Sequence, residues 1–328
     1  MLLSSSYLEK FLYNYIVNMI SIVSPVYNEA QGIRRFCEEI TALFSKIDYN
    51  LELILCVDPS TDGTENVIAD LHKEDQRIKS LIFSRRVGQD KATQAGIDFA
   101  NGNAVIVMDA DQQDPIETVP FFLKEWENGS KIVYATRVSR KKENYFKRAS
   151  ANLFYRILNS SAEVEIPRNT GDFRLMDKCV ILELRKYRED SFFLRALTPL
   201  IGFESKKIEI ARPAREVGET KYNRYFGGVK AAIRAIFGYT NFIQQFFLSI
   251  TTLFFLFLII FISFSLKIDQ KTTYSSLEIE NTIVIFGLVL LTLLSFSSWI
   301  IATYLNLIYK QVKNRPTYTV AKKIGFSD

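Results

Sequence analysis

The chain has 328 residues, of which 48% are hydrophobic and 23% charged, and its formal net charge is +5. This length accommodates one large domain or two ordinary ones. The three cysteines are widely spaced without a metal-binding pattern, which indicates reduced thiols. His72 is the only histidine, so the composition disfavours catalysis by a histidine general base.

Short apolar segments alternate with amphipathic ones from residue 20 onwards. Residues 1–18 precede them, include Glu9 and Lys10, and are interpreted as a dispensable extension, with Met19 as an alternative start. Strands are expected at residues 20–26, 51–57, 78–83 and 104–108. Helices are expected at residues 30–46, 64–73 and 91–100. This alternation predicts an α/β fold with a parallel, doubly wound sheet.

Polar and acidic residues follow three of these four expected strands. They are Asn28 and Glu29, then Asp58, then Asp109 and Asp111. Ligands of doubly wound sheets bind beyond the carboxyl ends of the strands. The sequence therefore predicts a binding site at this edge of the sheet.

Asp109 and Asp111 end the apolar run AVIVM. In an extended chain, positions i and i+2 point the same way, so both carboxylates are expected to converge. Two convergent carboxylates suit a hard divalent cation such as Mg²⁺ or Mn²⁺. The alternative is an ordinary surface turn, because Asp and Pro are turn residues.

The following region, residues 130–220, has a mixed pattern. We expect strands at residues 131–135, 173–176 and 208–212, and a basic helix at residues 146–158. Residues 222–240 are basic, aromatic and amphipathic, which indicates a segment lying along a membrane surface.

Two uncharged segments, residues 246–266 and 282–308, each exceed the roughly 20 residues that cross a bilayer. Basic residues lie before the first segment and after the second, whereas the connector (residues 267–281) is short and of mixed charge. By the positive-inside rule, both termini are therefore expected in the cytoplasm. A membrane-facing group of basic residues accounts for the positive net charge better than nucleic-acid binding does. The predicted organisation is an extension (1–18), a catalytic domain (19–221), juxtamembrane helices (222–244), two membrane helices (245–310) and a tail (311–328).

Five motifs run in the order found in family 2 glycosyltransferases of the GT-A fold. Together with the C-terminal helices, they most resemble the polyprenyl-phosphate glycosyltransferases, which include dolichol-phosphate mannose synthase and bacterial glucosyl relatives. The motifs are Ser24-Pro25-Val26-Tyr27-Asn28-Glu29, Asp58 with Ser60-Thr61-Asp62-Gly63-Thr64, Asp109-Ala110-Asp111 with Gln113-Asp114-Pro115, Gly171-Asp172-Phe173-Arg174-Leu175-Met176, and Arg215 with Gly218-Glu219-Thr220-Lys221-Tyr222. The resemblance implies a Rossmann-like, mostly parallel GT-A domain followed by a two-helix transmembrane hairpin.

Two stretches depart from the family pattern. The chain has Asp58-Pro59-Ser60 where the family usually has Asp-Asp-Gly-Ser, one acid fewer. It also has Ser84-Arg85-Arg86-Val87-Gly88-Gln89-Asp90 where the family has Ser-Arg-Asn-Phe-Gly-His-Gln, so the histidine is missing. How the nucleotide is bound, and what role residues 84–90 have, is therefore open at this point.

The resemblance also implies roles for individual residues. Asp109 and Asp111, with Gln113 as a further ligand, would hold Mg²⁺ or Mn²⁺ against the diphosphate of the donor. Pro25, Tyr27, Glu29 and Asp58 resemble the nucleotide-binding residues. A carboxylate such as Asp58 can accept a hydrogen bond from uracil, which favours a UDP-sugar.

Asp172 occupies the position usually regarded as the catalytic base, with Asp111 as the other catalytic residue. A phosphomonoester has its second pKa near 6, so a lipid phosphate hardly needs deprotonation. Asp172 could instead orient Arg174 or the sugar. Candidates for binding the acceptor phosphate are the cationic residues Arg137, Arg148, Arg174 and Lys221.

These observations predict an inverting, metal-dependent transfer of a hexose from a nucleotide sugar to polyprenyl phosphate at the cytoplasmic face of the bacterial plasma membrane. By resemblance, the enzyme forms a homo-oligomer, a tetramer. One alternative is a processive polysaccharide synthase, which generally has more helices and a Gln-x-x-Arg-Trp signature. Another is an inactive membrane scaffold, although Asp58, Asp109, Asp111 and Asp172 are all present.

Overall fold

A computed structural model gives the three-dimensional arrangement of the chain. It describes residues 18–137, 156, 159–160, 164–168, 170–189, 192–211, 245–254, 256–257, 260 and 276–326. The predicted N-terminal extension (apart from residue 18), the predicted juxtamembrane helices, most of the predicted helix at 146–158, and the candidates Arg148 and Lys221 lie outside these residues.

The described core is one eight-stranded mixed sheet with strand order β7-β5-β6-β4-β1-β2-β3-β8. Its central strands β4, β1, β2 and β3 run parallel, as the sequence predicted. The strands are β1 (Met19–Val26), β2 (Asn50–Val57), β3 (Ile78–Phe83), β4 (Ala104–Val107), β5 (Ile132–Arg137), β6 (Thr170–Asp177), β7 (Ser205–Ile210) and β8 (Val320–Ile324). The parallel centre and the covering helices confirm the predicted doubly wound α/β fold.

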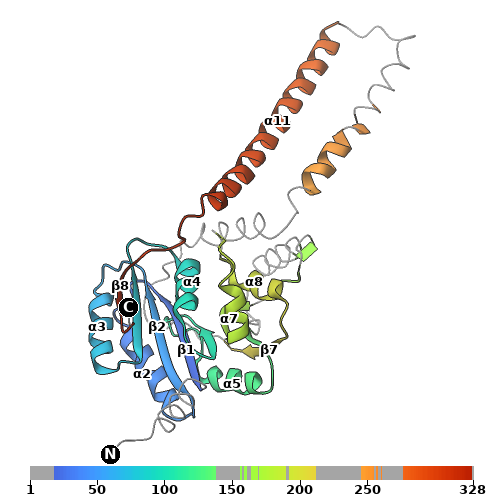
Figure 1. Cartoon of the computed structure of the whole chain (residues 1–328). Helices are drawn as coiled ribbons and strands as arrows, with labels where there is room; N and C mark the ends of the chain where they lie inside the picture. Colours follow the sequence, from blue (N-terminus) through green and yellow to red (C-terminus); the bar gives the residue numbers. More distant parts are fainter. Residues whose placement is uncertain are drawn as a thin grey trace, which may run out of the picture.

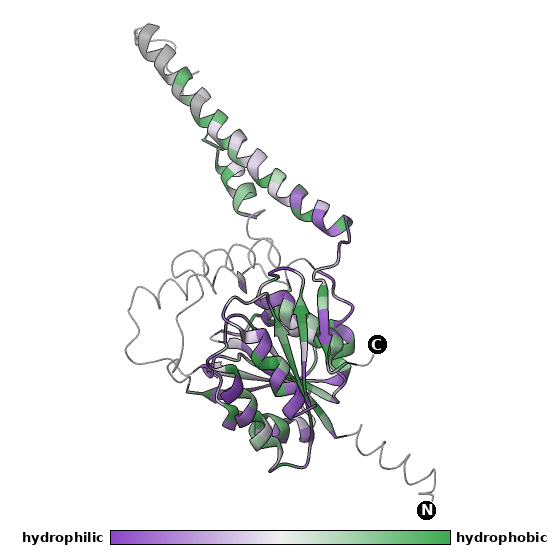
Figure 2. Ribbon diagram, turned by 90° about the vertical axis from the view of Figure 1, so that its left-hand side faces the viewer, coloured by the Kyte–Doolittle hydropathy of each residue, from purple (hydrophilic) through white to green (hydrophobic). Residues whose placement is uncertain are grey.

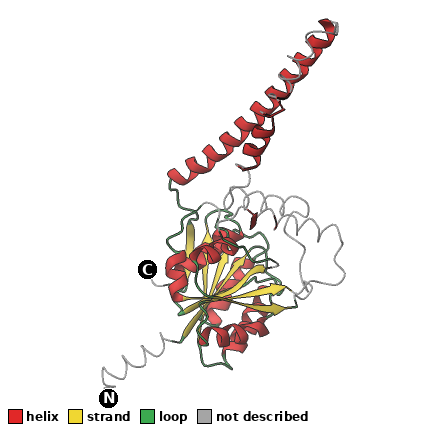
Figure 3. Ribbon diagram, turned by 90° about the vertical axis from the view of Figure 1, so that its right-hand side faces the viewer, coloured by secondary structure: helices red, strands yellow, loops and turns green. Residues whose placement is uncertain are grey.

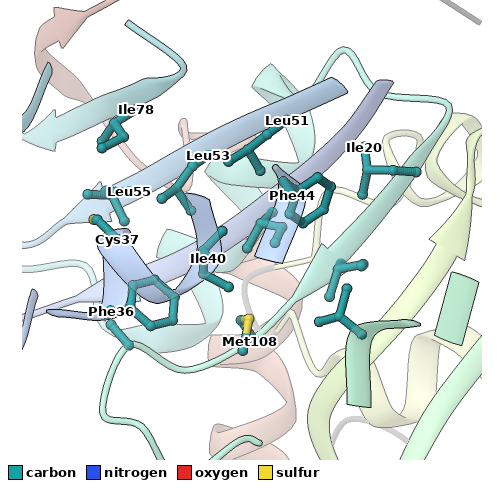
Figure 4. Close-up of a cluster of buried hydrophobic side chains, with 14 of the residues drawn as sticks. Ile20, Phe36, Cys37, Ile40, Phe44, Leu51, Leu53, Leu55, Ile78 and Met108 are labelled. Carbon is teal, nitrogen blue, oxygen red and sulfur yellow. The ribbon is translucent and has the colours of Figure 1, made fainter. Parts of the chain in front are cut away.

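Helices cover both faces of this sheet (Figure 3). One face carries α2 (Ile33–Phe44), α3 (Thr64–Glu74) and α5 (Val119–Glu127), preceded by the short η1 (Ile116–Thr118). The other face carries α4 (Gln89–Phe99), α7 (Lys178–Leu184) and α8 (Leu194–Ile201). Figure 4 shows part of the first layer, in which Phe36 and Ile40 of α2 belong to the same buried cluster as Leu53 and Leu55 of β2. Burial of alternate strand residues on both faces explains why the central strands β1, β2 and β4 are largely apolar.

A long helix, α11 (Ser276–Val312), projects from the domain (Figure 1). Its stretch Val289–Val312 has 24 residues and includes a window of mean hydropathy 1.5, so it is long and apolar enough to cross a membrane. Figure 2 shows that the described part of this helix is hydrophobic along most of its length and hydrophilic at the end nearest the sheet. Helix α11 thus includes the whole second predicted span, residues 282–308, and is longer than that span at both ends.

Only part of the first predicted span is described. Residues Gln245–Phe254 form a short apolar helix. Its Phe247 ring lies 5.1 Å from that of Phe296, and its Phe254 ring lies 5.4 Å from that of Phe286. These contacts place the two helices side by side and antiparallel. A complete two-helix hairpin remains a prediction, because residues 261–275 lie outside the described part of the chain.

The segment after α11 differs from the expected simple tail. It returns to the domain and forms β8, which pairs antiparallel with the edge strand β3. Lys322 and Lys323 lie on this outermost strand, where charged side chains discourage further strand pairing. The polar composition that made this segment read as a tail is therefore typical of an edge strand. Strand β7 is also shifted, since it ends at Ile210 rather than at residue 212.

Gly96 lets α4 lie very close to the sheet. A Cβ atom at this position would lie 2.2 Å from Cγ1 of Val23 and 2.8 Å from Sγ of Cys56. Both neighbours are fully buried strand residues that cannot move aside without disturbing the core. Glycine is therefore required by packing here, and α4 is fixed on β1 and β2.

Gly96→Ala is expected to lower the free energy of unfolding by about 1–3 kcal/mol, because the added methyl group overpacks this contact. Thermal unfolding of the full chain in detergent would measure the effect. Gly32→Ala is the matched control, because the atom nearest to its added Cβ is Oε2 of Glu29 at 4.0 Å. Equal melting temperatures for both variants would contradict the packing argument.

Candidate functional site

The acidic residues singled out in the sequence gather at one edge of the sheet. Strands β1, β2 and β4 are parallel, so the residues after Val26, Val57 and Val107 share an edge. Strand β6 runs the opposite way and pairs Arg174 with Val107, which brings Asp172 to the same edge as Asp109. The fold therefore brings together Asp58, Asp109 and Asp172 from separate parts of the chain.

Asp58 holds the loop that connects β3 to α4. Its side chain is only 4% exposed, and its Oδ1 accepts the Val87 N–H at 2.8 Å while its Oδ2 accepts the Gly88 N–H at 3.0 Å. Gly88 has φ +87°, a conformation that glycine adopts without strain. The sequence suggested a contact from Asp58 to uracil, and the structure adds that both of its oxygens position this loop.

The same loop supplies a partner for Asp109. Nε2 of Gln89, the first residue of α4, donates to Oδ1 of Asp109 at 2.9 Å. Gln89 lies in the stretch whose role the sequence left open. The structure thus places that loop directly against the first carboxylate of the Asp-Ala-Asp motif.

The motif itself forms a folded loop after β4. The Asp109 N–H donates to Oδ2 of Asp114 at 3.1 Å, and the Gln113 N–H donates to Oδ1 of Asp111 at 3.1 Å. Gln112 adopts φ +60°, which lets the chain reverse here. Asp109 and Asp111 stay half-exposed, so their carboxylates remain accessible to a ligand.

This pair of carboxylates fits a divalent cation that completes its shell with substrate oxygens. Mg²⁺ is typically bound by one or two carboxylates together with phosphate oxygens and water. Among the described residues, no group of three or more His, Cys, Asp or Glu side chains could enclose a metal by itself. The donor set therefore suits an open site rather than a closed structural one.

The predicted nucleotide-binding segment at the end of β1 is hydrogen-bonded to the loop after β2. The Glu29 N–H donates to Oγ1 of Thr64 at 2.9 Å, and the Asn28 N–H donates to Oγ of Ser60 at 3.1 Å. The guanidinium of Arg86 lies 3.9 Å above the centre of the Tyr27 ring. A cation over an aromatic face is attractive. These contacts fix the β1 end of the site against the β2 end, where Asp58 lies.

Asp172 lies among arginines. Arg195 of α8 binds it through two hydrogen bonds, Nε to Oδ1 at 3.0 Å and Nη2 to Oδ2 at 3.2 Å. Arg137 is also near, since a Cβ on the adjacent Gly171 would lie 3.1 Å from its Nη2. Burial alone would raise the pKa of Asp172, but the positive charges of Arg195, Arg174 and Arg137 hold it below the ordinary value. Asp172 is therefore ionised at neutral pH and a weak base.

Arg174, an expected phosphate ligand, is turned into the protein. It is 3% exposed and donates to the carbonyls of Leu194 at 3.1 Å and Gly171 at 2.9 Å, and to the hydroxyl of Thr198. Burial lowers its pKa to about 10, so it stays protonated at neutral pH. Arg174 and Arg195 line a cavity of about 330 Å³ beside Asp172. These contacts support a role in fixing β6 to α8, and they leave the predicted phosphate contact to other cations.

Two groups that the sequence reasoning missed are central to this site. Gln89 contacts Asp109, and Arg195 contacts Asp172. Gln89 could have been suspected, because it follows a glycine in a stretch that departs from the family pattern. No sequence signal marks Arg195, which lies 23 positions from its partner in a helix without a motif.

Arg195→Met is expected to destabilise the fold by about 2 kcal/mol at pH 7, because it leaves the Asp172 carboxylate partly buried without its main partner. The lowered pKa means that the pair stabilises the wild type above the ordinary carboxyl pKa, and that this contribution fades as the pH falls. The loss should therefore be smaller at pH 3, which is below the ordinary carboxyl pKa of 3.8, so that the contribution of the pair to the wild type is fading.

Chemical unfolding of both proteins at the two pH values checks this. Arg77→Met is the control, because it removes the partner of a more exposed carboxylate, Asp75. Its effect should stay below about 1 kcal/mol. Equal losses at pH 7 and pH 3 for Arg195→Met would contradict the assigned charge of Asp172.

Comparisons with known proteins agree with this geometry. The family model described as glycosyl transferase family 2 matches residues 21–185. The uncharacterized glycosyltransferase YkcC of Bacillus subtilis is 34% identical over 318 residues, covering 94% of this chain and 95% of that relative. The uncharacterized glycosyltransferase sll0501 of Synechocystis is 33% identical, covering 93% and 96%. A bactoprenol glucosyl transferase of Shigella phage SfII is 31% identical, covering 92% and 97%. The chain belongs to glycosyl transferase family 2 and is a glycosyltransferase.

Proposed function

We propose that this glycosyltransferase moves a hexose from a UDP-linked sugar to a polyprenyl phosphate, with inversion at the anomeric carbon, at the cytoplasmic face of the bacterial plasma membrane. The observation that carries the proposal is the shared edge of the sheet. Asp58 and Asp109 there face the β3–α4 loop, and Asp172 lies beside them among three arginines.

A lipid acceptor is supported by two further features. The relatives named bactoprenol glucosyl transferase match nearly the whole chain, including its apolar C-terminal part. The helix α11 is joined at its hydrophilic end to the sheet through β8, so the catalytic domain stays next to any membrane that the helix enters. An enzyme held at the membrane surface stays close to its lipid substrate, which favours their encounter. The domain boundaries and a homo-oligomer, such as a tetramer, remain predictions.

In this proposal the donor lies along the edge from β1 to β4. We assign Pro25, Tyr27 and Glu29 to the nucleotide, and Asp58 to a hydrogen bond from the uracil N–H. Asp109 and Asp111, with Gln113 as a further ligand, would hold Mg²⁺ or Mn²⁺. When bound, such a cation offsets negative charge on the departing diphosphate.

The acceptor side is assigned to the arginines around Asp172. Arg137 lies at the end of β5, close to Gly171, and can reach a phosphate at this edge. Arg148 and Lys221 remain candidates from the sequence. Because a lipid phosphate is already largely ionised and the pKa of Asp172 is low, we assign Asp172 the positioning of Arg195 and Arg137 rather than proton removal.

The direct test incubates membranes containing the full chain with polyprenyl phosphate and a panel of radiolabelled UDP- and GDP-sugars. One UDP-sugar should label the lipid fraction, and Asp111→Ala should lower this labelling by about 100-fold or more. Asp70→Ala, an exposed acid on α3, is the control and should keep full activity. Labelling of a growing polymer, or full activity in Asp111→Ala, would contradict the proposal.

Asp58→Asn is expected to weaken UDP binding by about tenfold or more, because one of its two acceptors becomes an amide donor facing a backbone N–H. Calorimetric titration of UDP into the purified full chain would measure this. Asp70→Asn keeps the same chemical change away from the site and should bind UDP like the wild type. Unchanged binding by Asp58→Asn would remove this residue from the donor site.

A further inference from the structure

A second charged site lies where the long helix meets the catalytic domain. It is a groove of about 900 Å³ between the end of α11, the segment that follows it, and the β3–α4 loop. Six cationic side chains from these elements, from the first turn of α4 and from the segment after α7 line it: Arg85, Lys91, Arg188, Lys310, Lys313 and Arg315. No Asp or Glu is among its lining residues in the described part of the chain. We call this site the basic groove.

The walls of the basic groove are tied together. Asp98 of α4 forms an ion pair with Arg188 and accepts the Tyr318 hydroxyl at 2.7 Å. Nε2 of Gln311 donates to the carbonyl of Arg188 at 3.1 Å. The groove is therefore a built feature of the fold. Arg188, one of its six cations, forms an ion pair with Asp98, which does not itself line the groove.

Capping of the helix explains only part of this cluster. The C-terminal end of a helix carries partial negative charge, which favours nearby cations such as Lys310 and Lys313. Nζ of Lys313 also lies 4.0 Å from the centre of the Tyr309 ring. Arg85 and Lys91, however, belong to the catalytic domain and converge on the same space from the opposite wall. Such convergence from several elements is typical of an anion site.

We propose that the basic groove binds the phosphate headgroup of an anionic phospholipid. The groove lies at the domain end of Val289–Val312, the stretch able to cross a membrane. Cations and tyrosines at the end of a membrane helix lie at the level of the headgroups, where each Lys or Arg attracts anionic lipid. This inference rests on the membrane attachment in the proposed function.

A bound headgroup would touch the loop that serves the donor site. Arg85 and Lys91 line the groove, while Val87, Gly88 and Gln89 between them contact Asp58 and Asp109. The two sites therefore share one short loop but use different residues of it. Anionic lipid is accordingly expected to steady the loop without occupying the donor site.

The test is native mass spectrometry of the full chain in detergent with equal amounts of phosphatidylglycerol and phosphatidylcholine. The wild type should retain phosphatidylglycerol with a preference of about tenfold, and the triple variant Lys310→Gln, Lys313→Gln, Arg315→Gln should lose it to within about twofold. The matched triple variant Lys46→Gln, Lys124→Gln, Lys206→Gln removes the same charge from exposed positions after α2, on α5 and on β7, and should keep the preference. Both variants should bind UDP like the wild type, which shows that they are folded.

An unchanged preference in the groove variant would overturn the inference. So would displacement of phosphatidylglycerol from the wild type by UDP, by polyprenyl phosphate or by millimolar inorganic phosphate, because each would assign the groove to that ligand instead. The readout needs no sugar transfer. A retained lipid preference without any transfer to polyprenyl phosphate would contradict the proposed function alone.

Discussion

The site depends on the carboxylate of Asp58, which is buried at the end of β2 and accepts the backbone N–H groups of Val87 and Gly88. These two bonds fix the start of α4 and so place Gln89 against Asp109. The position of α4 on the sheet is fixed, because Gly96 allows close contact between this helix and strands β1 and β2. The side chain of Asp58 thus sets the positions of the β2 and β4 ends relative to the β3–α4 loop. The same loop borders the basic groove on its other side.

Charge balance explains why the edge has two chemically different halves. Asp109 and Asp111 alone would repel a diphosphate, so this half is suited to a substrate that arrives with a divalent cation. The other half contains Asp172 with Arg195, Arg174 and Arg137, which leaves an excess of positive charge beside a single carboxylate. Such a half attracts a phosphate without a cation. In the proposed function, a donor diphosphate and an acceptor phosphate would therefore approach the same edge from neighbouring positions.

The central strands, the helix α11 and the acidic strand ends could be predicted from the sequence, because each depends on a local pattern. Buried parallel strands are continuously apolar, and a helix able to span a bilayer lacks charges. The partners of the acids could not be predicted, since Asp58 meets Val87 and Asp172 meets Arg195 only through the tertiary fold. Strand β8 was missed for a related reason. The lysines of β8 are typical of a polar tail, and only the pairing of β8 with β3 identifies the segment as a strand.

The central claim is that the sheet edge, and not the basic groove, holds the donor. A cryo-electron microscopy or crystal structure of the full chain with UDP and Mn²⁺ tests this most directly. The account predicts density for the cation in contact with Asp109 and Asp111, with the diphosphate beside it and the uracil toward Asp58. Density for UDP in the basic groove, or a cation bound away from Asp109 and Asp111, would contradict it.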